Sequence, residues 1–378
     1  CRNQVTMKGP LKSLKIVEFS GLGPGPLAGQ LLADLGADVI TVDKRSAKVD
    51  PTEINRRNKR SIALNLKSKD GIKIVKKIID SSDVLIEGFR PGVMEKLGIG
   101  PSNCHDKLIY GRMTGWGQVG KFSKTAGHDI NYLGITGALH AIGNDERPIP
   151  PLNLVADYGG GSMFLIFGIL AALYERNSSG KGQVVDSAMV DGVPAMMGLF
   201  HQFVANGNWL DGKRASNLLD GGAPFYRCYE CSDGRFVSVG ALESQFFAEL
   251  VRGIGLPEIE IKTQNDHETW PKKNEVYEKI FKSKSRDEWI KIFDGKDACV
   301  APVLTLAEAS EYPVNSERNV FFEQEGVLQA SPAPRFDRTP SITPKTIKGP
   351  GSGNEEILIE MGFTQEEIMD LKSNKILS

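Results

Sequence analysis

The opening of the chain constrains its fold more than any other segment. A short apolar run, Leu14–Phe19, is rich in strand-forming residues and precedes a turn of glycine and proline at 21–26. Leucines then recur at helical spacing as far as Gly36, a typical residue for a helix end. A second strand pattern follows at Val39–Val42. This order predicts a βαβ unit and therefore a parallel sheet.

The same alternation continues along the first half of the chain. Strand patterns cover Val84–Glu87 and Leu108–Met113, and a strongly apolar helix pattern covers Ser162–Glu175. The composition changes after Asn206, where glycine, asparagine and aspartate become frequent and a hairpin pattern follows. We predict an α/β protein whose Rossmann-like large domain has a parallel sheet, with a smaller α+β domain. The predicted bounds are 7–206 for the large domain, completed by 331–378, with a linker at 207–224 and the small domain at 225–330.

Bulk properties restrict the partners of the chain. Its 378 residues carry a formal net charge of -1, so no overall positive field favours nucleic acid. The longest apolar stretch, Met163–Leu173, is too short to cross a bilayer and predicts a buried helix, so we expect no membrane partner.

The N-terminus has no signal-peptide pattern, and we expect Met7 to be the native start. The last residues, Lys375–Ser378, do not match a Ser-Lys-Leu peroxisomal address.

The cysteines indicate a reducing compartment rather than a disulfide framework, because there are five of them and they are widely spaced. Cys228 and Cys231 form a C-x-x-C pair, but a structural zinc site needs further ligands at suitable spacing. We interpret the pair as ordinary strand or turn residues and expect no metal.

The glycine-rich turn matches a dinucleotide-binding fingerprint only in part. Gly21 and Gly23 follow a strand, and Asp43 lies at the expected distance for a ribose ligand. Pro26 occupies the third glycine position, however, and Pro24 and Pro26 both lack the N–H that a pyrophosphate requires. A plain Rossmann-like unit is favoured over an NAD site.

Basic residues recur where predicted strands end, and ligands of open α/β sheets bind at those ends. They favour an anionic ligand with several phosphates, although solvated surface side chains are the alternative for each one. These residues are Lys44, Arg45, Lys67, Arg90 and Lys96.

Two residues carry the candidate chemistry. His128 follows a glycine and precedes a predicted helix, so its side chain points to the space in front of that helix, where neighbouring N–H groups can face an anion. Asp157 precedes three glycines, which permit close approach to the backbone, although a carboxylate at a helix start is often only a cap. A histidine facing a carboxylate suits removal of a proton from one face of a carbon and its return to the other.

At this point several motifs resemble those of alpha-methylacyl-CoA racemases, which belong to the class III CoA-transferase superfamily. The resemblance covers nearly the whole chain from about residue 10 and thins after 330. The matching segments are Glu18–Pro26, Leu35–Val39, Asp83–Val93, Gly115–Gln118, Ala126–Tyr132, Pro151–Asp157, Gly180–Gln183, Leu219–Phe225 and Val239–Glu243.

The resemblance implies an interlocked homodimer whose substrate is an acyl-CoA, without further cofactor. It assigns the catalytic pair to His128 and Asp157, and a small-domain glutamate that supports the histidine from the other subunit to Glu243. The acyl chain is expected to be a branched fatty acid or a bile-acid precursor, and the compartment a peroxisome or mitochondrion, although no address is visible. The implied CoA contacts are Lys44, Leu64, Asn65, Leu66, Lys67, Gly88, Phe89, Arg90, Lys96, Gly127, Asp129, Ile130, Asn131 and Tyr132. Lys44 and Lys96 depart from the arginines that are frequent in the family, which removes bidentate phosphate binding there.

Three alternatives stay open at this stage. In class III CoA-transferases, the aspartate matching Asp157 is a nucleophile that carries the acyl group, and a histidine at the position of His128 is generally missing. A CoA-binding protein without chemistry and an NAD dehydrogenase are the other two.

Overall fold

The computed structural model describes residues 9–378, and Met7, the expected native start, lies outside the described residues. The chain forms two compact units. Unit 1 contains the described residues up to Thr136 together with Leu152–Met196 and Asn319–Ser378, and unit 2 contains Gly137–Pro151 and Met197–Arg318. These bounds differ from the predicted domains at 137–151, at 197–206 and at 319–330, because the chain passes between the units at points without a change of composition.

Unit 1 is built on a six-stranded parallel sheet in the order β3-β2-β1-β4-β5-β6. This is the strand order of a Rossmann-type fold, in which the direction of winding reverses between β1 and β4. The predicted α/β class and parallel sheet are confirmed. The strands are β1 Lys15–Phe19, β2 Asp38–Lys44, β3 Arg60–Leu64, β4 Val84–Glu87, β5 Ile109–Thr114 and β6 Val184–Ala188.

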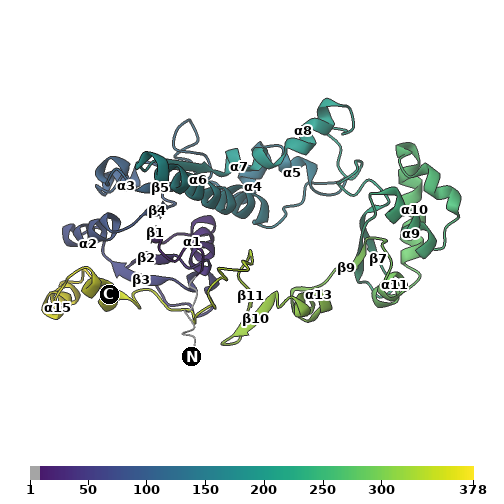
Figure 1. Ribbon diagram of the computed structural model, residues 1–378. Helices are drawn as coiled ribbons and strands as arrows, with labels where there is room; N and C mark the ends of the chain where they lie inside the picture. Colours follow the sequence, from purple (N-terminus) through teal and green to yellow (C-terminus); the bar gives the residue numbers. More distant parts are fainter. Residues whose placement is uncertain (1–8) are drawn as a thin grey trace. The chain divides into compact units, whose positions relative to one another are not determined.

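Helices cover both faces of this sheet (Figure 1). On one face α1 (Pro24–Asp34) packs on β1 and β2, and α6 (Phe164–Ser179) packs on β5 and β6. On the other face α2 (Lys69–Asp80), α14 (Asn354–Glu360) and α15 (Gln365–Ser373) share an apolar core with the strands. A capping box begins the last helix, because the Thr364 hydroxyl accepts the N–H of Glu367 and the Glu367 carboxylate accepts the N–H of Thr364.

The segment Asn319–Ser378 is fixed to the sheet by a buried arginine. The Arg57 guanidinium donates to the Asp34 carboxylate at 2.6 Å and to the carbonyl of Ala330 at 2.7 Å. Ala330 ends an antiparallel hairpin that the sequence patterns did not indicate. The other elements of unit 1 are η1 Ile54–Arg56, α3 Val93–Lys96, η2 Pro101–Asn103, α4 Asp129–Ile135, η3 Leu154–Met163, α7 Met189–Met196, β10 Phe321–Gln324 and β11 Val327–Ala330.

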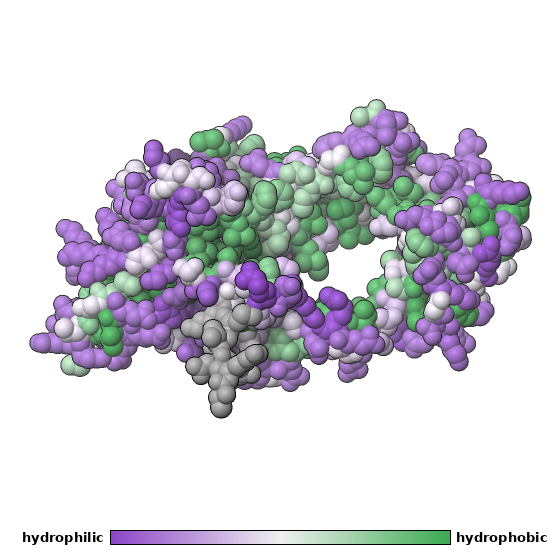
Figure 2. All heavy atoms as spheres, in the orientation of Figure 1, coloured by the Kyte–Doolittle hydropathy of each residue, from purple (hydrophilic) through white to green (hydrophobic). Residues whose placement is uncertain are grey.

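The predicted buried helix is longer and more exposed than the sequence indicated. A π-helix, η3, runs without a break into α6, so Leu154–Ser179 is one helix of 26 residues and only 33% of its most apolar window is buried. The length expectation was wrong because it counted uninterrupted apolar residues, whereas the helix also includes polar residues and glycines. Among the described residues it is long and apolar enough to cross a membrane, a test that core helices also pass. Figure 2 shows apolar surface along this helix.

Unit 2 is a small α+β unit, as predicted. The hairpin β7 (Tyr226–Glu230) and β8 (Phe236–Gly240) gains a third antiparallel strand, β9 (Val300–Pro302), which the sequence patterns did not indicate. Three helices and aromatic side chains such as Phe225 form its core. The helices of this unit are α5 Ala138–Ala141, α8 Gly198–Ala205, α9 Ser244–Gly253, η4 Glu258–Thr263, η5 His267–Thr269, α10 Trp270–Phe281, α11 Arg286–Phe293, α12 Leu306–Glu311 and α13 Pro313–Glu317.

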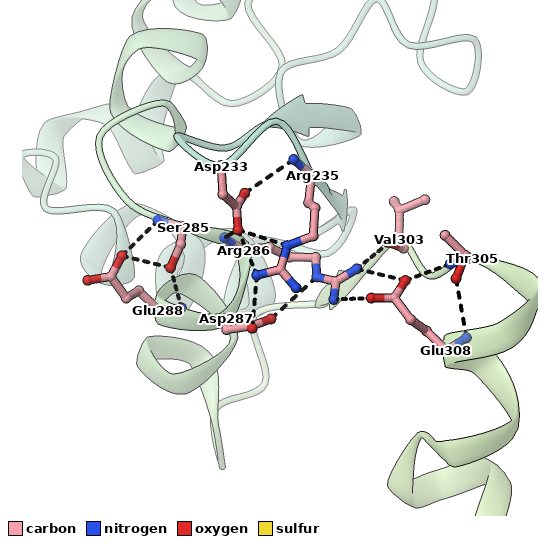
Figure 3. Close-up of polar contacts among 9 residues, drawn as sticks. All are labelled: Asp233, Arg235, Ser285, Arg286, Asp287, Glu288, Val303, Thr305 and Glu308. Carbon is pink, nitrogen blue, oxygen red and sulfur yellow. Dashed lines mark hydrogen bonds and ion pairs between the residues drawn. The ribbon is translucent and has the colours of Figure 1, made fainter.

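A charged network ties α11 and α12 together within unit 2 (Figure 3). The Arg286 guanidinium donates to the Glu308 carboxylate at 2.7 Å and to the carbonyl of Val303 at 2.9 Å. Glu308 also accepts the N–H of Thr305 in a capping box. These bonds and Arg286 lower the pKa of Glu308 to about 2. The network therefore fixes the start of α12 against the first turn of α11.

Candidate active site

His128 is the residue that immediately precedes α4. Its backbone is extended, its N–H donates to the Asn131 side chain at 3.0 Å, and its carbonyl accepts the N–H of Asn131 at 2.8 Å. The predicted junction between a loop and a helix is confirmed, and the side chain of His128 is exposed there.

Asp129 connects this junction to the segment that carries Asp157. One oxygen of its buried carboxylate accepts the N–H of Ala156 at 2.9 Å and the N–H of Asp157 at 2.8 Å. Its other oxygen is buried without a hydrogen-bond partner among the described residues. Because Asp129 directly follows His128, these two bonds bring the two candidate residues into one site. The sequence placed Asp129 among the ligand contacts and did not reveal this bridging role.

From the sequence, Asp157 could have been a cap at a helix start. In the structure it lies within the π-helix η3. Such helices are rare and occur often at functional sites. Gly160 packs so closely on α7 that a β-carbon would lie 2.9 Å from the backbone nitrogen of Val193, which explains one of the three glycines. The Asp157 side chain is half-buried, and burial is the main cause that raises the pKa of its carboxyl group. The Asn153 amide lowers this pKa, Asp129 raises it and His128 lowers it.

The glycine-rich turn faces Asp157 instead of a nucleotide. Gly23 precedes α1 with a φ of 71°, and a β-carbon added there would lie 3.4 Å from one carboxylate oxygen of Asp157. The Ser162 hydroxyl donates to the carbonyl of Pro24 at 2.7 Å and so holds the turn against η3. The turn therefore forms a wall of the candidate site.

An aromatic cluster packs behind His128. The rings of Trp116 and Tyr132 meet edge to face with centroids 4.7 Å apart. A β-carbon on Gly127 would lie 2.8 Å from the Tyr132 ring, and one on Gly115 would lie closer still, so both positions need glycine. Burial, and secondarily the Asp157 carboxylate, raise the pKa of the Tyr132 hydroxyl. Trp116 was not predicted as a site residue, although the glycines on either side of it are a signal of close packing.

A groove opens at the carboxyl ends of β1 to β4, where the predicted CoA contacts gather. Its volume is about 610 Å³. The structure brings six of the predicted CoA contacts together there, because four neighbouring strands end at the same edge of the sheet. These six are Lys44, Leu64, Asn65, Leu66, Lys67 and Phe89. The lining residues are Ser20, Val42, Lys44, Arg45, Ser46, Leu64, Asn65, Leu66, Lys67, Phe89, Val93 and Leu97.

The other predicted CoA contacts do not line this groove. Gly88 and Arg90 flank Phe89 in the chain, and Lys96 ends α3, next to the lining residue Leu97. Gly127 and the α4 residues Asp129–Tyr132 belong to the His128 site, where Ile130 and Asn131 are exposed. The groove and the candidate residues His128 and Asp157 all lie in unit 1.

Comparison with known proteins decides the family of this chain. The CoA-transferase family III profile matches residues 11–355. The chain belongs to this family. It is 44% identical over 374 residues to the alpha-methylacyl-CoA racemase of Mus musculus and 43% identical to that of Homo sapiens, with 97% of each chain covered. Its fold matches a CAIB/BAIF family protein from Brucella suis with a TM-score of 0.80 and 24% identity, over 94% of this chain and 100% of that one.

In this member of CoA-transferase family III, Asp43, the acidic residue of the partial dinucleotide fingerprint, already has hydrogen-bond partners within the protein. The buried Asp43 carboxylate accepts from the Arg56 guanidinium at 2.7 and 2.9 Å and from the Ser61 hydroxyl at 2.6 Å. A ribose hydroxyl would have to displace these bonds. This geometry agrees with the preference for a plain Rossmann-like unit.

Glu243 lies in unit 2, immediately before α9, and is exposed. Its expected support of the histidine involves a second subunit and stays a prediction. Cys228 lies in β7, Cys231 follows that strand, and both are free thiols, in agreement with their interpretation as strand and turn residues.

Proposed function

We propose that this protein interconverts the two enantiomers of 2-methylacyl-CoA thioesters, with His128 and Asp157 as its acid–base pair. One observation carries the proposal: the Asp129 carboxylate holds the N–H of Asp157 at 2.8 Å while Asp129 itself follows His128. The similarity to two mammalian alpha-methylacyl-CoA racemases supports the same reaction.

The reaction moves one proton on each face of the α-carbon. For one enantiomer, His128 takes the α-proton and the electron pair of the C–H bond enters an enolate. The Asp157 carboxylic acid then delivers its proton to the opposite face, and for the other enantiomer the roles reverse. In the first direction Asp157 must hold a proton, and burial, which raises the pKa of its carboxyl group, favours the protonated form.

The enolate oxygen requires hydrogen-bond donors. We assign this role to backbone N–H groups near Asp129, at the start of α4. The Asp129 carboxylate fixes this helix start to the backbone of η3. Loss of one such donor typically costs about 10²–10³ in rate. The mechanism uses only proton transfers, so it requires no metal and no redox cofactor.

We propose that CoA occupies the groove at the ends of β1 to β4. Lys44, Arg45 and Lys67 supply the positive charges that its phosphates require. Arg90 and Lys96, adjacent in the chain to lining residues, would extend this charge. A branched fatty acyl chain or a bile-acid precursor is the proposed acyl group.

A homodimer is part of the proposal. Phe167 and Tyr174 on α6 are 71% and 80% exposed, and Leu154 and Met163 on η3 are 56% and 42% exposed. A second copy that covers this apolar face would remove it from water. Sedimentation equilibrium should give a dimer, and a monomer that racemises at full rate would contradict this part.

The proposed compartment is a peroxisome or a mitochondrion, which imaging of the tagged protein would test.

The alternative is a CoA-transferase in which Asp157 attacks the thioester and carries the acyl group. The name of the family favours it, and the half-buried Asp157 carboxylate faces the open turn at Gly23. An exposed histidine bound through Asp129 to the same segment favours the racemase.

One experiment separates the two reactions. The protein is incubated in D₂O with one enantiomer of a 2-methylacyl-CoA, and the α-hydrogen is followed by NMR. The proposal predicts deuterium uptake together with appearance of the other enantiomer. Transfer of CoA from the thioester to an added carboxylic acid, without deuterium uptake, would instead establish the transferase.

A further inference from the structure

The outer edge of the sheet is covered by the end of the described chain. β3 is the edge strand, and β2 pairs with only one of its sides. On the other side, the carbonyl of Ser61 accepts the N–H of Gly353, and the N–H of Ala63 donates to the side chain of Asn354 at 2.9 Å. An edge strand with free N–H and C=O groups would be open to pairing with another chain, and these contacts close it.

The segment 376–378 continues this cover to the point where β3 ends. Leu377 forms an antiparallel bridge with Leu64, the last residue of the strand, and the N–H of Ser378 donates to the carbonyl of Ala63. Leu377 is 1% exposed in the core shared by α2, α14 and α15. The Asn354 amide donates to the carbonyl of Ser378, so a side chain also holds this segment.

The first residue beyond the strand depends on the same segment. The N–H of Asn65 donates to the carbonyl of Ile376 at 2.8 Å. β2 offers Asn65 no partner, because their pairing ends at Lys44 and Leu64. The backbone of Asn65 is therefore fixed by a residue from the far end of the described chain.

Asn65 in turn sets the course of the loop that lines the groove. Its side-chain oxygen accepts the N–H of Lys67 at 3.1 Å, and its carbonyl accepts the N–H of Ser68 before α2 begins. Leu64, Asn65, Leu66 and Lys67 all line the groove. A shift of Asn65 would therefore move the Lys67 ammonium group, one of the positive charges at this site.

We propose that Ile376 and Leu377 are positioning residues for the nucleotide part of CoA, an inference that rests on the proposed function. They hold the loop Leu64–Lys67 in the form that binds the phosphates, before the substrate arrives. His128 precedes α4 and Asp157 lies in η3, so loosening this segment weakens CoA binding and leaves the proton transfers intact.

The test compares two variants of the full chain that remove equal volume from one core. Leu377→Ala loosens the positioning segment, whereas Ile368→Ala removes an isoleucine, also 1% exposed, from α15 in the same core. The measurements are the CoA dissociation constant by calorimetry, thermal stability without ligand, and kcat/KM for a CoA thioester and for the matching pantetheine thioester. Leu377→Val, a milder change, replaces Leu377→Ala if the latter does not fold.

We expect both variants to lose thermal stability, and only Leu377→Ala to bind CoA about five- to tenfold more weakly, the effect of about one hydrogen bond. Its kcat/KM should fall for the CoA thioester and stay unchanged for the pantetheine thioester, which lacks the nucleotide. Equal CoA affinity in the two variants, or an equal loss for both thioesters, would overturn the inference alone. Failure of the unmodified protein to bind CoA would overturn the proposed function as well.

Discussion

The Asp129 carboxylate accepts the backbone N–H of Asp157 at 2.8 Å, and so joins the segment of the candidate histidine to that of the candidate aspartate. The same carboxylate oxygen also accepts the N–H of Ala156. Two N–H groups of a π-helix thus obtain a charged acceptor, and such bonds are about twice as strong as neutral ones. Position and electrostatics at Asp157 therefore both depend on Asp129.

The first prediction separates these two effects of Asp129. Asp129→Asn keeps a carbonyl oxygen for the two N–H groups and removes the negative charge that raises the Asp157 pKa. For the enantiomer from which Asp157 takes the α-proton, the acid limb of the kcat profile should therefore move to lower pH, with folding preserved. Asp129→Ala leaves two N–H groups without an acceptor, each at a cost of about 1–3 kcal/mol, so its kcat should fall at every pH. Identical profiles for the two variants would contradict this account.

A second prediction concerns Asn153, whose amide donates to the Asp157 carboxylate at 3.4 Å and lowers its pKa. Asn153→Ala removes this donor, so the carboxyl pKa should rise further above the ordinary aspartate value. For the enantiomer from which Asp157 takes the α-proton, the acid limb of the kcat profile should then move to higher pH, opposite to the shift for Asp129→Asn. If both substitutions moved the limb in the same direction, the limb would not report Asp157.

Gly23 offers a test of the turn that faces Asp157. Gly23→Ala places a β-carbon 3.4 Å from a carboxylate oxygen, at a φ of 71° and a ψ of -115° that lie outside the regions allowed to residues with a β-carbon. Gly180→Ala is the control for a positive φ alone, because Gly180 has a φ of 71° with a ψ of 6°, in the left-handed helical region, and open space around it. Both variants should lose stability in chemical denaturation, Gly23→Ala more than Gly180→Ala, and only Gly23→Ala should lose kcat by more than tenfold. A similar kcat for the two would show that the turn does not limit the site.

The charged network of unit 2 predicts a pH dependence of stability. The pKa of Glu308 is lowered from 4.5 to about 2 in the folded protein, so the folded state binds its proton less readily than the unfolded state. Its contribution to stability is complete above pH 4.5 and is lost as the pH falls from 4.5 towards 2. Glu308→Gln should flatten this part of the curve, measured by denaturation with tryptophan fluorescence. Glu311→Gln, which removes a charge from the end of the same helix, should leave the slope unchanged.

Local patterns predicted the regular elements well. The strand Val84–Glu87 has the predicted bounds, because its four residues form an unbroken buried run. The strand Val300–Pro302 and the hairpin β10–β11 were missed, since short strands are stabilised by partners that a local pattern does not include.

The candidate site was predictable in its residue types and not in its connections. Glycine next to His128 and three glycines after Asp157 indicated close packing, and the structure has it. The bond from the Asp157 N–H to Asp129 and the bond from the Asn65 N–H to Ile376 join segments far apart in the chain. Their partners are set by tertiary structure, which no spacing of residues records.

The central claim is that His128 and Asp157 act on opposite faces of one α-carbon, and deuterium exchange with single variants tests it most directly. Each enantiomer of a 2-methylacyl-CoA is incubated in D₂O with His128→Ala and with Asp157→Asn. Each variant keeps one base, so we predict that each exchanges the α-hydrogen of one enantiomer only, without inversion, and that the two variants select opposite enantiomers. Exchange of the same enantiomer by both variants, or racemisation at the full rate by either, would contradict the account.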